Sequence, residues 1–279
     1  MKIAVLLNAH QNSQLFRDTL DSVRTYLSKD IFVLVDGSYW KEFDNLEYNK
    51  ICGFRHGENI SEVNHSLRSR APHRNVALGL NKIYEFYKDS VDWYCYLESD
   101  CLITSERVLY DLECFLKEDY WVVGNDVRSI NSKLKIMSRF LGNDFDDLRY
   151  CLGCCVFYNS NFIKKLYEDN FFEKFLSITN FYSEFTCGFY YEDSKESVYD
   201  ISEYLYPTLA HYYGGKIKEL NRWNDVENKW KDNKYLMRFR PDINESDPYL
   251  GSYVLHPIKE FSNPIRQYYK NKRNKSFYI

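Results

Sequence analysis

The first 35 residues predict a βαβ unit, and this unit constrains the fold of the whole chain. Residues 2–7 form a largely apolar run, which is typical of a parallel strand covered on both faces. Residues 13–27 then carry apolar side chains at helical spacing behind Ser13, a favoured capping residue. Residues 31–35 form a second apolar run. Two parallel strands joined by a right-handed helical crossover are therefore expected, as in an α/β protein.

The alternation of strands and helices continues to about residue 124 and weakens after it. Glycine and proline positions and apolar spacing predict further strands at 51–54, 93–97, 121–124, 152–158 and 252–255 and helices at 72–87, 105–115, 159–167 and 203–213. Ser202 is expected to cap the last of these helices, and Pro207 to interrupt it. Residues 216–251 are polar and aromatic, so we expect loops or a lid there.

Composition excludes several classes of protein. The net charge of −3 argues against general nucleic-acid binding. Eight cysteines occur, but they do not form paired CxxC units at zinc-like spacing with histidine, so we expect reduced thiols, mostly in the core, in a cytoplasmic protein. The apolar run at the N-terminus is too short for a signal peptide or a membrane span.

Polar residues follow three of the predicted strands directly. Asn8-Ala9-His10 follow the first strand, Asp36 follows the second, and Glu98-Ser99-Asp100 follow the strand that begins at Trp93. Ligands of open α/β sheets bind at the carboxyl ends of strands. Two carboxylates one residue apart at such an end are costly to hold together without positive charge. A hard divalent cation with a phosphorylated ligand would supply that charge; the alternative is three solvated turns.

The predicted helix after the second strand opens with Pro72-His73-Arg74-Asn75, which places Arg74 in its first turn. A guanidinium beside helix-terminal N–H groups is suited to a diphosphate. A surface ion pair is the alternative role for Arg74.

Together, residues 2–103 resemble the nucleotide-sugar transferases of the GT-A fold. The resemblance is carried by the opening strand and loop, Val33-Leu34-Val35-Asp36-Gly37-Ser38, Pro72-His73-Arg74-Asn75 and Leu97-Glu98-Ser99-Asp100. It implies a Rossmann-like, mostly parallel central sheet flanked by helices, with a C-terminal acceptor-side or lid region. It further implies one domain over residues 1–261, with a nucleotide-binding half (1–124) and an acceptor half (125–261), followed by a basic tail (262–279).

The resemblance also implies roles for single residues. Asp36 would bind the base or ribose of the donor, Arg74 would approach the nucleotide, and Asp100 would ligate Mn²⁺ or Mg²⁺ on the diphosphate. The family motif is usually Asp-x-Asp, so the presence of Glu98 leaves open whether this first acid contacts ribose or metal. Asn8, Ala9, His10 and Ser99 would line the nucleotide-sugar site at the same strand ends.

Three later residues fit the same family pattern. His256 follows the last predicted strand and would be a further metal ligand. Glu203, at the start of its helix, would be the catalytic base of an inverting transfer, with Glu192 and Asp193 as competing residues. Gly153 would let the acceptor or diphosphate approach the backbone closely. Exposed aromatic side chains such as Trp223 and Tyr212 would stack on an acceptor sugar, unless they belong to the core.

The function implied is a metal-dependent glycosyltransferase of the hexosyltransferase class. It would move a sugar from a nucleotide-sugar donor, a UDP- or GDP-sugar, to a hydroxyl of a glycan or lipid-linked acceptor. One alternative is a GT-A-like binding module without catalysis. The other is a sugar-phosphate nucleotidyltransferase, although residues 8–12 contain no glycine for the phosphate loop it needs. The basic residues from Arg266 to Lys275 predict either a disordered, solvated terminus or a contact with an anionic membrane surface.

Overall fold

The structure is a computed structural model that describes residues 1–9, 13–35, 43, 48–53, 71–131, 147–177, 201–224, 226–227, 229–237 and 251–276. Four residues to which the sequence analysis gave a role lie outside this part of the chain: His10, Asp36, Glu192 and Asp193.

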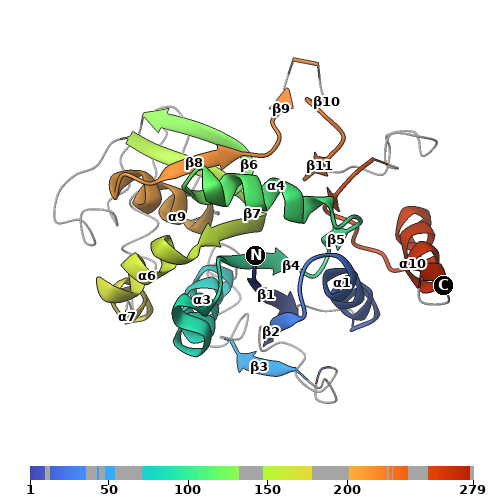
Figure 1. Cartoon of the computed structure of the whole chain (residues 1–279), viewed down its shortest axis with the longest axis horizontal. Helices are drawn as coiled ribbons and strands as arrows, with labels where there is room; N and C mark the ends of the chain where they lie inside the picture. The colour runs from blue at the N-terminus through green and yellow to red at the C-terminus, as the bar shows by residue number, and fades with distance from the viewer. Residues whose placement is uncertain are drawn as a thin grey trace, which may run out of the picture.

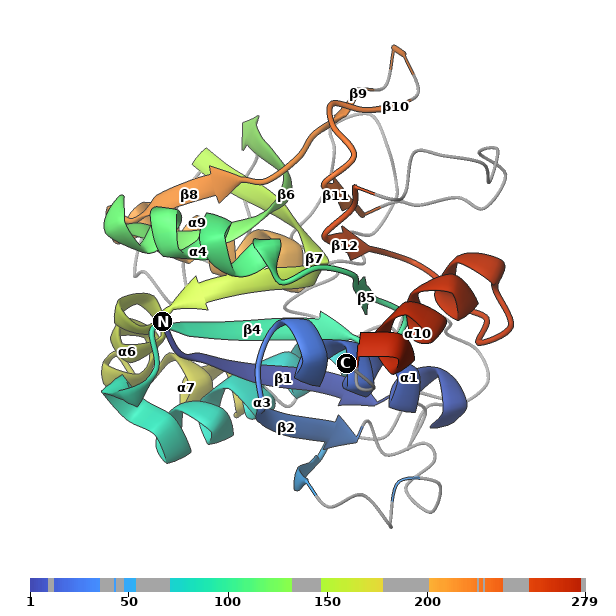
Figure 2. The same ribbon diagram turned by 45° about the vertical axis from the view of Figure 1, so that its right-hand side comes forward.

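A seven-stranded sheet forms the centre of the molecule, with the order β3-β2-β1-β4-β7-β6-β8 (Figure 1). Its strands are β1 (Ile3–Ala9), β2 (Asp30–Val35), β3 (Asn49–Cys52), β4 (Trp93–Glu98), β6 (Tyr120–Asn131), β7 (Asp147–Asn159) and β8 (Lys216–Glu219). Strands β1 to β4 are mutually parallel where they pair, and β7 runs antiparallel to β4 and β6. Figure 2 shows the arrowheads of β1, β2 and β4 pointing one way and that of β7 the other.

Helices cover both faces of the sheet because alternate side chains of its central strands are buried on opposite sides. One apolar core takes Ala4 and Leu6 of β1, and the other takes Val5 and Leu7. The first core is closed by α3 (Ala71–Tyr87), α6 (Ser160–Glu168), α7 (Phe171–Leu176) and α9 (Ile201–Tyr212). The second is closed by α1 (Ser13–Tyr26), α4 (Arg107–Lys117) and α10 (Pro264–Ser276). The predicted fold class, a mostly parallel sheet flanked by helices, is confirmed.

Short strands from the last third of the chain return to the carboxyl end of β4. A three-stranded sheet has the order β11-β12-β5, formed by β11 (Tyr235–Leu236), β12 (Val254–Leu255) and β5 (Leu102–Ile103). Strands β9 (Trp223–Asn224) and β10 (Lys229–Trp230) form a separate antiparallel pair. Figure 2 shows β5 and β12 beyond the arrowhead of β4.

Helix α9 differs from the prediction at both of its marked positions. It begins at Ile201, so Ser202 lies within the helix, and it continues through Pro207. Proline removes a backbone hydrogen bond from a helix interior. Here tertiary packing outweighs that loss, since Leu205, Leu209 and Ala210 are completely buried in the first core. Part of the predicted loop after α9 is also a strand, because β8 pairs in parallel with β6.

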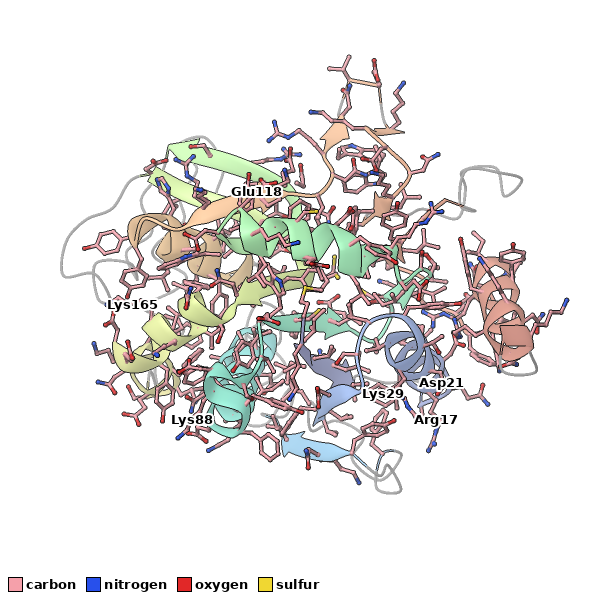
Figure 3. All side chains as sticks on the ribbon, viewed as in Figure 1. Arg17, Asp21, Lys29, Lys88, Glu118 and Lys165 are labelled. Atoms are coloured by element: carbon pink, nitrogen blue, oxygen red, sulfur yellow. The ribbon has the colours of Figure 1, made fainter. Side chains whose placement is uncertain are left out.

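The C-terminal segment is a helix, not the disordered, solvated terminus predicted as one alternative. Residues 264–276 form α10, which lies beside α1 in both ribbon views (Figures 1 and 2). Arg266 and Arg273 are 0% and 2% exposed, and both guanidinium groups bind the buried carboxylate of Asp18 on α1. Other charged residues of α1, such as Arg17 and Asp21 labelled in Figure 3, are exposed. The charge pattern of the sequence alone does not show that two of these basic residues pair with a buried acid, Asp18.

None of the described helices is both long enough and apolar enough to cross a membrane.

Candidate functional site

Three of the predicted site segments meet at one edge of the sheet. In the β1–β4 pair Asn8 lies opposite Glu98, and in the β1–β2 pair Ala9 lies opposite Val35, the residue before Asp36. The Asn8 amide nitrogen lies 3.5 Å from the hydroxyl of Tyr96, whose side chain comes from β4. The strands therefore end side by side, as the sequence predicted, and they bring Asn8, Ala9 and Glu98 together.

The acidic triplet forms a tight turn after β4. The backbone N–H of Cys101 donates to the Glu98 carbonyl at 3.0 Å. Thr19 of α1 stabilises this turn, because its hydroxyl lies 2.6 Å from the Ser99 carbonyl oxygen and 2.8 Å from the Cys101 carbonyl oxygen. Ser99 itself is buried. The turn is thus held by backbone contacts, while the Glu98 and Asp100 carboxylates lie on its accessible side, with 40% and 18% of their side chains exposed.

His256 reaches the same turn because β12 pairs with β5. The two strands are antiparallel with Leu255 opposite Leu102, which places the next residue, His256, beside the acidic turn. The N–H of Ile258 donates to the Asp100 carbonyl at 2.9 Å and closes the contact. His256 Nε2 consequently lies 3.2 Å from Asp100 Oδ1 and 3.3 Å from Glu98 Oε2.

The electrostatics of this cluster favour positive charge. Burial alone would lower the pKa of His256, but Cys154, Asp100 and Glu98 raise that pKa well above its usual value. Burial alone would raise the pKa of Asp100, but its hydrogen bond to His256, the charge of His256 and the charge of Lys259 bring it below the usual value. The site therefore places acidic groups around an imidazole. These groups are stabilised by a nearby positive charge, which a bound cation would also supply.

The residues that could hold a metal ion only partly match the predicted set. Asp100, Cys101 and His256 each offer a ligand atom, and these three atoms lie within 4.8 Å of one another. Asp100 and His256 were predicted as metal ligands; Cys101 was not. Cys101 is one of the eight cysteines expected to be reduced thiols, mostly in the core. Carboxylate oxygen suits Mn²⁺ and Mg²⁺, whereas a thiol does not suit Mg²⁺.

The predicted base lies next to the predicted glycine. The N–H of Gly153, on β7, donates to Glu203 Oε1 at 2.6 Å. A methyl group on Gly153 would come within 3.0 Å of the Glu203 side chain, so only glycine allows this approach without displacement. Gly153 precedes Cys154, whose carbonyl accepts a hydrogen bond from the Cys101 thiol at 3.1 Å. The peptide bond between Gly153 and Cys154, with these two hydrogen bonds, connects Glu203 to the acidic turn.

Arg74 and Trp223 make contacts within the fold, whereas Tyr212 is exposed. Arg74 Nη2 donates to the Leu176 carbonyl at the end of α7 at 3.0 Å, and burial lowers the Arg74 pKa. The ring of Trp223 packs edge to face on Trp230, with centroids 5.6 Å apart. Tyr212 is 37% exposed at the end of α9.

Sequence reasoning missed two residues that support the turn, Thr19 and Arg266. Arg266 Nη2 lies 3.3 Å from the carbonyls of both Cys101 and Ile258, so one guanidinium joins the loop that carries Asp100 to the loop that carries His256. No local pattern marks such contacts, because they join residues 165 and 8 positions apart.

Comparison with known proteins gives a likeness of fold. No family model and no curated protein matches the sequence. Among solved structures, the galactosyltransferase LgtC in complex with donor and acceptor sugar analogs is 13% identical, with 98% of this chain and 95% of that chain covered and a TM-score of 0.46. A glycosyltransferase involved in glycosylation of the major capsid of PBCV-1 is 11% identical, with 98% and 100% covered and a TM-score of 0.44.

A third similar structure is a CMP:2-keto-3-deoxy-manno-octonic acid synthetase complexed with CTP, 11% identical, with 79% of this chain and 89% of that chain covered and a TM-score of 0.38. The similar structures thus include glycosyltransferases and a synthetase. At these identities and TM-scores the likeness does not extend to substrate or mechanism.

Proposed function

We propose that the protein is a glycosyltransferase that uses a nucleotide-sugar donor and a divalent cation. The observation that carries this proposal is the convergence of Glu98, Asp100 and His256 at the carboxyl end of β4, at 3.2–3.3 Å from Nε2 of the histidine. An anionic cluster of this kind at the ligand-binding edge of an α/β sheet is suited to a cation that carries a diphosphate.

In this proposal the residues at the strand ends have different roles. Asp100 and His256 hold the cation, which when bound neutralises charge on the leaving diphosphate. Asn8, Ala9 and Ser99 line the donor site, and Glu98 lies on its accessible side, within reach of ribose or cation. His10 and Asp36 would extend the donor site from the ends of β1 and β2. Arg74 would approach the nucleotide with the guanidinium N–H groups that do not bind the Leu176 carbonyl.

Glu203 is the proposed base that deprotonates the acceptor hydroxyl in an inverting transfer. The hydrogen bond from Gly153 fixes the Glu203 carboxylate beside β7, and Glu203 lies in the first turn of α9. Glu203→Gln keeps the shape of the side chain but cannot accept a proton. We expect donor affinity to be preserved and kcat to fall by about 10²–10⁴-fold, the usual contribution of general base catalysis. A near-normal kcat, or a product with retained anomeric configuration, would contradict this role.

The acceptor would be a hydroxyl of a glycan or of a lipid-linked sugar. A membrane-associated acceptor would meet the exposed basic residues of α10, such as Lys272 and Lys275, because Arg266 and Arg273 are occupied by Asp18.

A thermal-shift panel of UDP-, GDP-, CMP- and dTDP-sugars, with and without divalent cation, tests the proposal. A ligand that binds only the folded state raises the melting temperature, and we expect one donor to do so only with cation present. Asp100→Ala should abolish that shift, whereas Asp89→Ala, which alters a surface carboxylate with 62% of its side chain exposed, should retain it.

Product analysis separates the remaining alternatives. Release of a nucleoside diphosphate supports glycosyl transfer. Release of pyrophosphate from a nucleoside triphosphate and a sugar phosphate would show a nucleotidyltransferase. Donor binding without turnover by any tested acceptor or water would show a binding module.

A further inference from the structure

The acidic turn is also a thiol site. Cys101 follows Asp100 directly and is completely buried, and its sulfur lies within 4.8 Å of the ligand atoms of Asp100 and His256. The linear spacing of the cysteines contains no zinc motif. The three donors meet only because β12 pairs with β5 and brings His256 to the turn.

A second thiol borders the same cluster. Cys154 lies on β7, the strand that pairs with β4, and is 4% exposed. Its backbone carbonyl accepts a hydrogen bond from the Cys101 thiol at 3.1 Å. Its sulfur also contacts the Met237 sulfur at 3.7 Å. Sulfur atoms therefore line the buried side of the cluster, and the carboxylates of Glu98 and Asp100 line the accessible side.

The histidine is oriented for metal binding. Its Nδ1 lies 3.4 Å from the Met237 carbonyl, while Nε2 faces Asp100 and Glu98. A proton on Nδ1, donated to that carbonyl, leaves the Nε2 lone pair directed at the cluster. Outer hydrogen bonds of this type commonly fix the tautomer of a metal-bound histidine.

We propose that this site selects Zn²⁺ over Mn²⁺ and Mg²⁺, with Asp100, Cys101 and His256 as ligands. Thiolate and imidazole are preferred ligands of Zn²⁺, whereas Mg²⁺ takes oxygen ligands almost exclusively. In a tetrahedral zinc site the ligand atoms are roughly 3.3–3.8 Å apart, as follows from bonds of about 2.0–2.3 Å. The three ligand atoms lie within 4.8 Å of one another here, so they would move closer together by about 1 Å to bind the ion.

This inference deepens the proposed function, on which it rests for the task of the cation but not for the identity of the ligands. It differs from the expectation of Mn²⁺ or Mg²⁺ that the family resemblance implies. A hard cation would use the two carboxylates and leave the thiols without a role in the site.

Metal competition on the full chain tests the inference without an activity measurement. The protein, kept reduced, is dialysed against equimolar Zn²⁺, Mn²⁺ and Mg²⁺, and bound metal is measured by mass spectrometry. We expect about one Zn²⁺ per chain. Substitution by Co²⁺ should give the intense near-ultraviolet absorption of thiolate-to-cobalt charge transfer, a signature that carboxylate and imidazole ligands alone do not produce.

Variants assign the thiol. Cys101→Ser should remove the charge-transfer absorption and weaken Zn²⁺ binding by more than the roughly 10–100-fold that loss of an outer partner costs. Cys154→Ser should change the intensity or energy of the absorption. Cys114→Ser is the matched control, because Cys114 is an exposed free cysteine on α4 and should leave both readouts unchanged.

The outcomes separate the two proposals. Preference for Mn²⁺ or Mg²⁺, or Co²⁺ binding by the wild type without charge-transfer absorption, overturns the inference even if Cys101→Ser fails to fold. Nucleotide-sugar binding that requires Mn²⁺ and is unchanged in Cys101→Ser overturns it while the proposed function stands. Tight Zn²⁺ binding through Cys101 in a protein that binds no nucleotide sugar supports the inference and refutes the proposed function.

Discussion

Asp18→Asn should destabilise the protein far more than an ordinary loss of one charge. In the structure a single carboxylate is shared by two guanidinium groups, with Arg266 Nη1 at 2.8 Å from Asp18 Oδ2 and Arg273 Nη2 on the other oxygen. All three side chains are at most 3% exposed. Removal of one partner from a buried ion pair costs about 3–5 kcal/mol, because the remaining charge stays buried without compensation. Here two positive charges would remain.

Urea denaturation gives the change in unfolding free energy, and its uncharged denaturant does not screen the ion pairs. For a chain of this size a loss of 3–5 kcal/mol corresponds to a fall in Tm on the order of 10 °C. Glu113→Gln is the matched control. Glu113 pairs with Lys117 at 2.9 Å, but 52% and 71% of these side chains are exposed, so we expect a stability close to that of the wild type.

A second variant distinguishes buried charge from lost packing. Replacement of Asp18, Arg266 and Arg273 together by leucine and methionine removes every charge of the cluster while it approximately keeps the volume. Buried ion clusters replaced in this way are often neutral or more stable, so the triple variant should recover part of the loss, although it also removes the hydrogen bonds from Arg266 to the carbonyls of Cys101 and Ile258. If Asp18→Asn falls within about 0.5 kcal/mol of the wild type, as surface substitutions do, the cluster does not anchor α10.

Two further predictions concern the candidate site. Thr19→Val should destabilise the fold by about 1–3 kcal/mol, because the carbonyls of Ser99 and Cys101 lose a buried hydrogen-bond donor. It should also weaken cation-dependent binding of the nucleotide sugar in a titration. Thr19→Ser should restore the stability and the affinity, and a valine variant with wild-type affinity would refute the positioning role. Asp36→Ala should weaken nucleoside binding in calorimetry even without cation, and an unchanged affinity would show that Asp36 is only a turn residue.

The sequence predicted the central sheet well because its strands are buried on both faces. Such strands read as continuous apolar runs, as in residues 3–7, 31–35 and 93–97, and they stop where polar residues begin. Parallel neighbours end at the same edge, so the position of the site followed from the ends of the runs. Asn8 opposite Glu98 is the direct result.

The errors arose where long-range packing outweighs local preference. Pro207 breaks an isolated helix, but its neighbours Leu205 and Leu209 are completely buried, and the apolar area they bury outweighs one lost hydrogen bond. The basic residues of α10 have the composition of a solvated tail. Only the position of Asp18, 248 residues earlier than Arg266, shows that the helix is anchored.

The same limit explains why the sequence singled out Asp100 and did not single out Cys101. An acid after a buried strand is recognisable from its immediate neighbours, because burial of unpaired charge is costly wherever it occurs. A buried cysteine costs nothing by itself, so its meaning depends on what the fold places beside it.

The candidate site depends on the C-terminal helix although no residue of that helix offers a ligand to it. Arg266 donates to the carbonyls of Cys101 and Ile258, which belong to the two loops that present Asp100 and His256. The same guanidinium is neutralised by Asp18 of α1, next to Thr19, whose hydroxyl binds the acidic turn from the other side. One guanidinium, itself held by one buried acid, therefore links the two loops in addition to the direct hydrogen bond from Ile258 to the Asp100 carbonyl. Loss of that acid should consequently disturb cation binding at concentrations of denaturant, or temperatures, below those at which the sheet unfolds.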